Sequence, residues 1–408
     1  QSNALPEKGV VLVTINYRLG AMGYMAHPAL SETDPNGVSG NYGTLDQIAA
    51  LQWVKDNISA YGGDPDNVTI FGESAGSWSV TELRASRLAK WLFHKAIGQS
   101  GASSYHMGQM EGEGVGWPSG YQTGAKVADA LGLRTPTADE LRAVPAEKLQ
   151  SIITEEMSEG FHHNRDGYVF PENVGIAFAT GNYNKVPMLF GYNSDEGTLF
   201  FPDDPQPTVW LPDTVSGDAA ALTSQLSKAF PNNAGKLVEL YDLDTDFTTG
   251  GTQMMGDEIF GVNVRYVARQ NELQGGDSYL YFFSRVPPSE KQTLGAFHAA
   301  EIPFVFGSYE PILGQSKEDE ALAELIQNYW VNFAKAGNPN GDGLPGWPLH
   351  QSEHWMHLTA NTGETSGALT HIRKDKIDAL EEGLFVKLEA LEASQNPPQS
   401  TGQMAAPN

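Results

Sequence analysis

The sequence contains no cysteine among its 408 residues. This absence excludes disulfides, thiolate nucleophiles, zinc–thiolate sites and iron–sulfur clusters together. Basic residues are also few, because 25 Lys and Arg stand against 50 Asp and Glu, which gives a net charge of −25. Nucleic-acid binding depends on Lys and Arg that neutralise phosphates, so the sequence predicts no nucleic-acid partner. The same negative charge would repel anionic membrane surfaces.

Long hydrophobic runs are lacking as well. The longest, near residues 10–15, is far shorter than the roughly 20 residues that cross a bilayer, so no membrane span is predicted. With 40% hydrophobic and 10% aromatic residues, the chain still has enough apolar material for a large core. No secretory leader is visible in the sequence. The compartment stays open, because secreted, periplasmic and intracellular locations all fit a chain without cysteine.

Strand-like and helix-like patterns alternate along the chain. Residues 9–16 and 67–71 are short β-branched apolar runs, typical of strands buried on both faces of a parallel sheet. Between them, residues 41–58 have apolar side chains at helical spacing. Further strands are predicted at 95–99, 186–190 and 278–283, and further helices at 80–92, 125–131, 138–153 and 321–336. The alternation predicts an α/β fold with a mostly parallel, wound sheet and helices on both faces.

No internal repeat or linker divides the chain, so residues 1–395 are predicted to form a single domain. Within it, residues from about 200 to 275 are predicted to be a mostly helical insertion. Residues 396–408 are rich in Pro, Gln, Ser and Gly and are predicted to be a flexible tail.

The strongest chemical signal is Gly-Glu-Ser-Ala-Gly at residues 72–76. This Gly-x-Ser-x-Gly pattern follows an apolar strand and precedes a predicted helix, and that context makes it informative. A sharp strand-to-helix turn forces the serine into a strained conformation, and the glycines let neighbouring backbone approach. Ser74 is therefore predicted to be a nucleophile at the positive end of the helix. The N–H of Ala75 is predicted to bind the oxyanion of a tetrahedral intermediate.

A serine nucleophile needs a base and an orienting acid, in the chain order serine, acid, histidine. His298 follows a predicted strand, at the carboxyl end where wound sheets keep their sites. The acid is predicted near residues 191–197, which also follow a strand. Asp195 and Glu196 both remain possible from the pattern alone.

Metal sites are not predicted. His162 and His163 are adjacent but lack a third ligand at suitable spacing. Residues 242–246 resemble the first half of a calcium loop, but Phe247 takes the place of the glycine that such a loop needs.

The ordered landmarks make the chain resemble the type-B carboxylesterases, which include cholinesterases and bacterial para-nitrobenzyl esterases. The resemblance extends over about residues 5–384. It rests on residues 16–20, 40–46, 50–54, 61–76, 92–101, 193–197, 297–304 and 329–334.

The resemblance implies an α/β-hydrolase fold and two-step hydrolysis of small ester molecules through an acyl-enzyme. It implies Ser74 as nucleophile, His298 as base and Glu196, rather than Asp195, as acid. It further implies that Ser100 supports Glu196 by hydrogen bonding, with Glu73 also beside the catalytic groups. No cofactor and no metal are implied for the reaction.

The chain departs from the family pattern at its start. The family's remaining oxyanion donors come from a Gly-Gly loop upstream of Asn16, and neither this loop nor the first strands are present in the sequence. One absent strand would lie between the strands predicted at 9–16 and 67–71. A missing N-terminal segment of the same protein is therefore expected as a partner, and the chain alone is expected to be a weak enzyme. Two alternatives to an active esterase are considered: a non-catalytic adhesion module of this fold, and an inactive truncated fragment of the esterase.

Overall fold

The structure is a computed structural model. It describes residues 3–105, 107–111, 118–154, 160–200, 219–286, 288–289, 293–308, 315–351 and 353–395. Among these, no helix combines the length and the apolar character needed to cross a membrane.

A six-stranded sheet runs through the middle of the molecule in the order β1-β2-β5-β6-β7-β8. All neighbouring strands are parallel except β7 and β8, which are antiparallel. The strands are β1 (Thr69–Glu73), β2 (Lys95–Gln99), β5 (Met188–Asn193), β6 (Ser278–Phe283), β7 (His354–Leu358) and β8 (Gly367–Thr370). Two residues each of β3 (Gly108–Gln109) and β4 (Asn164–Arg165) pair separately.

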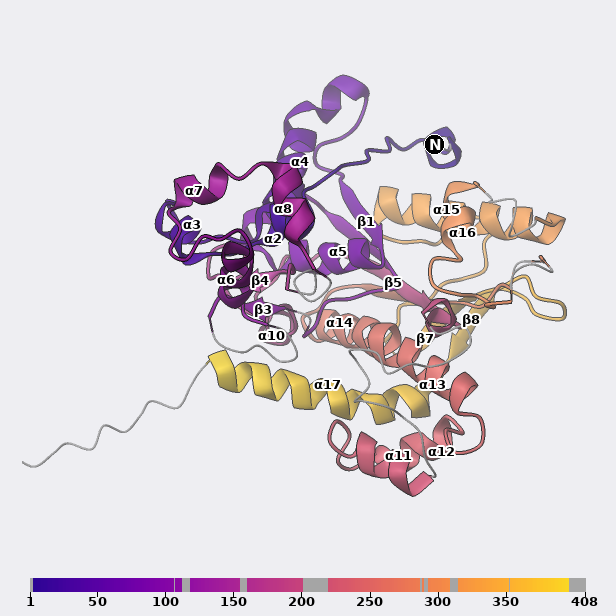
Figure 1. Ribbon diagram of the computed structural model, residues 1–408. Coiled ribbons are helices and arrows are strands. Elements are labelled where there is room, and N and C mark those ends of the chain that lie inside the picture. Colours follow the sequence, from indigo (N-terminus) through magenta and orange to yellow (C-terminus); the bar gives the residue numbers. More distant parts are fainter. Residues whose placement is uncertain are drawn as a thin grey trace, which may run out of the picture.

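Helices cover both faces of the sheet, as the alternating pattern predicts. Figure 1 shows α15 and α16 on one side of the sheet and α14 and α17 on the other. The first face carries α1 (Ala4–Glu7), α15 (Ile302–Phe306) and α16 (Lys317–Ala336). The second carries α4 (Tyr42–Asn57), α5 (Ala75–Ala85), α10 (Val174–Thr180), α14 (Val262–Leu273) and α17 (Lys374–Gln395).

A smaller apolar cluster lies among α2 (Gly20–Tyr24), α3 (Pro28–Glu32), α6 (Gly120–Ala130), α7 (Ala138–Arg142) and α8 (Ala146–Ile152). The short 3₁₀ turns are η1 (Ile58–Tyr61), η2 (Arg87–Ala89) and η3 (Glu196–Leu199). The single helix predicted at 138–153 is two helices here, because Pro145 lies between them and caps the second. The helix predicted at 80–92 begins earlier, at Ala75, and ends at Ala85.

The predicted insertion is helical in its described part. It contains α11 (Ala219–Leu226), α12 (Ala234–Leu240), α13 (Phe247–Gly256) and α14, with the π-helical turn η4 (Asp257–Gly261) joining the last two. Residues 201–218 and the predicted tail 396–408 lie outside the described residues. That residues 1–395 form one domain stays a prediction.

One predicted strand is wrong. Residues 9–16 have no strand structure, and the side chains of Val11, Val13 and Ile15 are 45%, 37% and 42% exposed. The apolar pattern is that of a buried strand, but a strand needs a neighbour whose backbone pairs with it. Among the described residues, nothing lies alongside this segment to provide that pairing.

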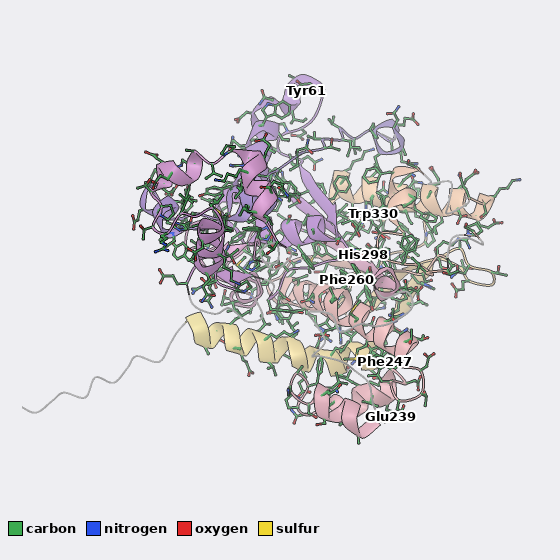
Figure 2. All side chains as sticks on the ribbon, viewed as in Figure 1. Tyr61, Glu239, Phe247, Phe260, His298 and Trp330 are labelled. Carbon is green, nitrogen blue, oxygen red and sulfur yellow. The ribbon has the colours of Figure 1, made fainter. Side chains whose placement is uncertain are left out.

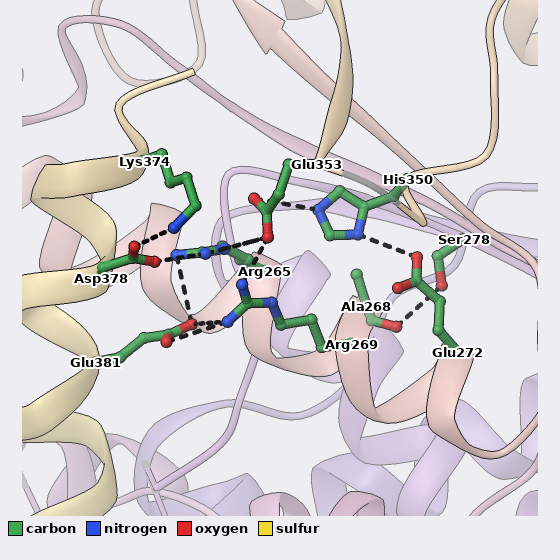
Figure 3. Close-up of polar contacts among 10 residues, drawn as sticks. All are labelled: Arg265, Ala268, Arg269, Glu272, Ser278, His350, Glu353, Lys374, Asp378 and Glu381. Carbon is green, nitrogen blue, oxygen red and sulfur yellow. Dashed lines mark hydrogen bonds and ion pairs between the residues drawn. The ribbon is translucent and has the colours of Figure 1, made fainter. Parts of the chain in front are cut away.

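A buried ionic cluster fastens α17 to α14 and to the chain just before β7 (Figure 3). Arg265, whose side chain is 1% exposed, lies 3.1 Å from Glu353 and 2.6 Å from Asp378. Its third acidic neighbour, Glu381, is at 3.5 Å. Arg269 contacts Glu353 and Glu381 as well, but its side chain is 36% exposed. One buried guanidinium therefore compensates three carboxylates from two segments.

Replacing this buried cation is expected to destabilise the fold strongly. Arg265→Ala should lower the free energy of unfolding by about 3 kcal/mol, because three carboxylates each lose their buried counter-charge and keep only the more exposed Arg269 or Lys374. Arg269→Ala, the matched control, should lower it by about 1 kcal/mol, because that charge remains partly hydrated. Urea unfolding of both variants measures the difference. Equal losses would contradict the assignment of Arg265 as the buried centre of the cluster.

Candidate active site

Ser74 occupies the turn between β1, which ends at Glu73, and α5, which begins at Ala75. Its φ of 55° and ψ of −119° lie in a region that non-glycine residues rarely adopt. The turn is tight, because a Cβ added to Gly72 would lie 2.4 Å from the carbonyl carbon of Gly76. The Ser74 N–H is held by the Gln99 carbonyl at 2.9 Å. The strained backbone that the Gly-x-Ser-x-Gly pattern predicts for Ser74, at a strand-to-helix turn, is therefore present.

Ala75 provides the first amide of α5 and is exposed. The first amides of a helix have no intrahelical carbonyl to bind, and they lie at the positive end of the helix dipole. The Ala75 N–H is therefore suitably placed for an anion next to Ser74.

His298 and Glu196 meet at the carboxyl ends of two neighbouring strands. His298 lies in the loop between β6 and α15, and Glu196 begins η3 directly after β5. The Nδ1 atom of His298 is 2.6 Å from Oε2 of Glu196. The other carboxylate oxygen, Oε1, accepts the N–H of Asn193 at 2.6 Å. Both side chains are almost fully buried, so this contact is shielded from solvent.

Asp195, the other acid that the sequence allows, makes its hydrogen bonds to Ala296 and Ser194 and not to His298. Its carboxylate accepts the N–H of Ala296 at 2.9 Å and the hydroxyl of Ser194 at 2.7 Å. Its own N–H donates to the Ala296 carbonyl at 3.1 Å. Asp195 therefore fastens the loop that carries His298, whereas Glu196 contacts the imidazole itself.

The far nitrogen of the imidazole faces Glu73. His298 Nε2 is 3.2 Å from Oε1 of Glu73, within ion-pair distance. Among the described residues, no hydrogen bond joins the Ser74 hydroxyl to this ring. The structure therefore brings Glu196, His298 and Glu73 together, with Ser74 adjacent in sequence to Glu73 but not hydrogen-bonded to the imidazole. Contacts of this kind often tighten only when a ligand binds.

A third carboxylate, Glu301, lies close to this group and is 1% exposed. Its Oε1 accepts Nε2 of Gln99 at 2.8 Å and its Oε2 accepts Nδ2 of Asn193 at 2.6 Å. The sequence did not single out Glu301, since its burial depends on Gln99 and Asn193 at the ends of β2 and β5. Its position three residues after His298 was the one available signal.

Burial and mutual repulsion perturb these groups. Burial, followed by the charge of Glu301, raises the pKa of Glu73 to about 8. Burial, with the charge of Glu196, also raises the pKa of Glu301. For His298, burial lowers the pKa, but the hydrogen bond and charge of Glu196 and the charges of Glu73 and Glu301 outweigh it, so the pKa is raised. The site therefore favours a protonated imidazole.

Among the described residues, Ser100 makes no hydrogen bond to Glu196. Its backbone adopts φ 50° and its N–H donates to the Gly191 carbonyl at 2.8 Å. Its buried hydroxyl has no hydrogen-bond partner among the described residues. Glu196 instead takes its supporting hydrogen bond from the Asn193 N–H.

Aromatic rings enclose the imidazole. Phe260 from the π-helical turn η4 stacks on His298 with ring centroids 4.8 Å apart, and Phe200 lies at 5.2 Å. Figure 2 shows Phe260 and His298 side by side in the centre of the molecule. The rings exclude water from one side of the base, which strengthens its electrostatic contacts.

The other histidines considered in the sequence lie elsewhere. His163 pairs with the buried Glu82, at 2.7 Å from its carboxylate. Burial lowers the pKa of His162 to about 4. Within the described part of the chain, no three His, Asp or Glu side chains are grouped to hold a metal ion.

Removing the carboxylate at Nε2 should change the pH profile. In Glu73→Gln the group facing Nε2 can neither ionise nor share a proton with the imidazole, so the contribution of the ionised Glu73 to the raised pKa of His298 is lost and that pKa should fall. If His298 is the general base, which works only when neutral, the acidic limb of kcat/KM should move down by about half a unit to one unit. Ester hydrolysis followed from pH 5 to 9 measures this shift, with the exposed Glu147→Gln as the control. A limb that stays in place, or moves up, contradicts the coupling.

The comparisons with known proteins agree on one family. The model of the carboxylesterase family matches residues 1–379. Mouse (Mus musculus) carboxylesterase 1F is 35% identical over a match covering 87% of this chain and 66% of the mouse protein. Para-nitrobenzyl esterase of Bacillus subtilis is 36% identical, with 84% of this chain and 68% of that enzyme covered. The chain therefore spans about two thirds of the length of these relatives.

Solved structures show the same likeness. Carboxylesterase EST55 of Geobacillus stearothermophilus superposes with a TM-score of 0.74 at 30% identity, covering 93% of this chain and 78% of that one. A PNB esterase gives a TM-score of 0.70 at 32% identity, covering 90% and 73%. With the α/β-hydrolase architecture, the serine turn and a family match over nearly the whole described sequence, the chain belongs to the carboxylesterase family.

Proposed function

We propose that this protein hydrolyses carboxylic esters through an acyl-enzyme on Ser74. His298 removes the serine proton as the hydroxyl oxygen attacks the ester carbonyl carbon, and the alcohol leaves with that proton. Water, deprotonated by the same imidazole, then attacks the acyl carbon and releases the carboxylic acid and the serine. Glu196 fixes the imidazole tautomer and stabilises the imidazolium. The Ala75 N–H binds the oxyanion.

The observation that carries the proposal is the strained serine turn at the carboxyl end of β1, at the same edge of the sheet as the loops that carry the buried His298–Glu196 pair. The esterase names of the relatives support the reaction class. For Ser74 to reach the base, the imidazole must exchange Glu73 for the serine hydroxyl at Nε2.

Covalent labelling tests this function without depending on high turnover. A fluorophosphonate probe should form a phosphonyl ester on native protein, and tandem mass spectrometry should place it on the peptide that contains Ser74. Heat-denatured protein, the control, should not react, because the turn and its base are then lost. A folded protein that stays unlabelled favours the adhesion module or inactive fragment instead.

A further inference from the structure

A cavity of about 380 Å³ lies where the short β3–β4 pair meets the start of α6 (Figure 1). Gln109 of β3, Arg165 of β4 and Tyr121 of α6 line it, and it is termed the Arg165 pocket. No residue of the proposed active site contributes to its walls. Its volume is at the small end of the range of ligand pockets, which is about 300–1,000 Å³. The Arg165 pocket is therefore separate from the catalytic groups and of a size for a small molecule.

The guanidinium of Arg165 is unpaired. The side chain is partly buried, and its Nε atom is shielded from solvent but donates no hydrogen bond in the described structure. Its terminal nitrogens make no hydrogen bond or ion pair with the described residues either. A guanidinium carries several N–H donors, and a shielded donor without an acceptor is destabilising. The wall of this pocket thus holds a cation whose hydrogen-bonding capacity is unused.

The nearby carboxylates do not serve as its counter-ion. One oxygen of Asp166 accepts the backbone N–H groups of residues 168–170 at 2.8–3.0 Å. The other oxygen accepts Nδ2 of Asn41 at 2.9 Å. Glu111 also lines the pocket, but it is exposed to water and makes no ion pair with Arg165 in the part of the chain that the structure describes. The guanidinium therefore remains available to an anion from solution.

The walls of the pocket are fixed without a ligand. Asn41, whose side chain is buried, accepts the N–H of Asn164 at 3.0 Å and donates to the Asn164 carbonyl at 2.7 Å. These bonds hold the strand directly before Arg165. The hydroxyl of Tyr121 donates to Oγ of Ser31 at 2.9 Å, which fixes the ring in its wall. A site held in this way needs little rearrangement to bind, which lowers the cost of binding.

The charges and the apolar groups of the lining favour one class of anion. A guanidinium can donate two parallel N–H bonds to the two oxygens of a carboxylate. A dianionic phosphate would instead meet the charges of Asp166 and Glu111 with a single cation to balance them. Met110 and Val38 add apolar surface, which suits the hydrocarbon body of an organic acid better than a bare inorganic ion.

We propose that the Arg165 pocket binds a small organic monocarboxylate. The carboxylate accepts two N–H bonds from the guanidinium, and the organic body lies against Met110 and Tyr121. Binding is reversible, and no covalent bond changes. The acids that an esterase releases belong to this class, but the site does not depend on that reaction.

The methyl group of Met110 reports binding at this place in the protein. Benzoate is the probe, added to the full 408-residue protein with carbon-13 in its methionine methyl groups. With 10 methionines in the chain, the Met110 signal is identified by its loss in Met110→Leu. It should shift at roughly millimolar benzoate, whereas benzamide, which has the same shape without the charge, should leave it in place.

Three outcomes of this titration would overturn the proposal. A Met110 signal that does not move shows that benzoate does not enter the pocket. An equal shift with benzamide shows that the carboxylate is not what is recognised. Inorganic phosphate that shifts the signal at lower concentration than benzoate shows that the pocket prefers an inorganic anion.

Replacing the guanidinium tests its part in binding. Arg165→Gln should weaken benzoate binding by about tenfold or more, because an amide cannot supply the charged pair of donors. The matched control is Arg87→Gln. Arg87 is exposed and donates to the Gly167 carbonyl at 3.4 Å, at the edge of the pocket, but does not line it. Binding should be unchanged in this control, and equal binding by Arg165→Gln contradicts the proposal.

A second variant removes the space instead of the charge. Val38→Phe places a ring in the pocket and should also abolish the benzoate shift. Thermal unfolding of each variant without benzoate confirms that it is folded. Fluorophosphonate labelling of Ser74 is recorded in parallel and should be unchanged in all three variants. Unlabelled native protein that still binds benzoate would refute the esterase mechanism alone, so the two proposals fail separately.

Discussion

Ser74→Ala is expected to lower kcat/KM for para-nitrophenyl acetate to close to the rate of the uncatalysed reaction, the largest loss that this site can show. The reason is that the proposed pathway requires the serine oxygen to form the acyl bond, and alanine provides no atom for it. The remaining groups, among them His298 and Ala75, still bind and polarise the ester, which leaves only a small residual rate. The measurement is initial rate at equal concentrations of folded protein.

The control for this prediction is Ser59→Ala. Ser59 lies exposed in η1, away from β1, so its loss should leave the rate unchanged. Circular dichroism of both variants confirms that folding is intact. Undiminished turnover by Ser74→Ala would show that the observed hydrolysis arises elsewhere, and the assignment of the nucleophile would be wrong.

Glu196→Gln is expected to lower kcat/KM by about 10⁴. In the proposed mechanism the carboxylate accepts the Nδ1 proton of His298, so that the lone pair of Nε2 can act as base. An amide of the same shape can offer its N–H to Nδ1, which moves the ring proton to Nε2 and blocks the base. Because both groups are buried, no water can replace the amide at Nδ1, and the inactive tautomer stays the favoured one.

Replacing the neighbouring residue Asp195 is the control for Glu196→Gln. Asp195→Ala should change kcat/KM by about tenfold at most, but should lower the free energy of unfolding by about 1–2 kcal/mol. Its carboxylate holds the Ala296 N–H and so fixes the loop before His298, without touching the ring. Kinetics and urea unfolding of both variants separate the two carboxylates. A larger kinetic loss in Asp195→Ala than in Glu196→Gln would reverse their roles.

The sequence predicts much of this fold, because its strongest signals are local. The strands at 95–99 and 278–283 have the predicted bounds, since each is a short apolar run covered on both faces. The Gly-Glu-Ser-Ala-Gly turn is similarly local, and its backbone strain arises within residues 72–76. The choice between Asp195 and Glu196 could not be made from local sequence. It came from the family resemblance, as both carboxylates follow the same strand.

Non-local features escaped prediction. Residues 9–16 have the composition of a buried strand, yet pairing depends on a neighbour and not on composition. Glu301 resembles any other glutamate in the sequence, and only the convergence of β2 and β5 buries it against Gln99 and Asn193. The approach of Glu73 to Nε2 depends on side-chain rotamers, which no sequence spacing specifies.

The π-helical turn η4 joins α13 and α14, and its extra width helps to set the position of Glu196. On one side of it, α13 packs on η3, where a Cβ added to Gly256 would lie 2.9 Å from Cβ of Glu196. On the other side, α14 packs against β6. A wider turn between them changes the angular phase of the two halves, so each presents its own face to its own neighbour. Deleting one residue from 257–261 would restore regular α-helical phase, and α13 and α14 could then no longer fit both neighbours at once.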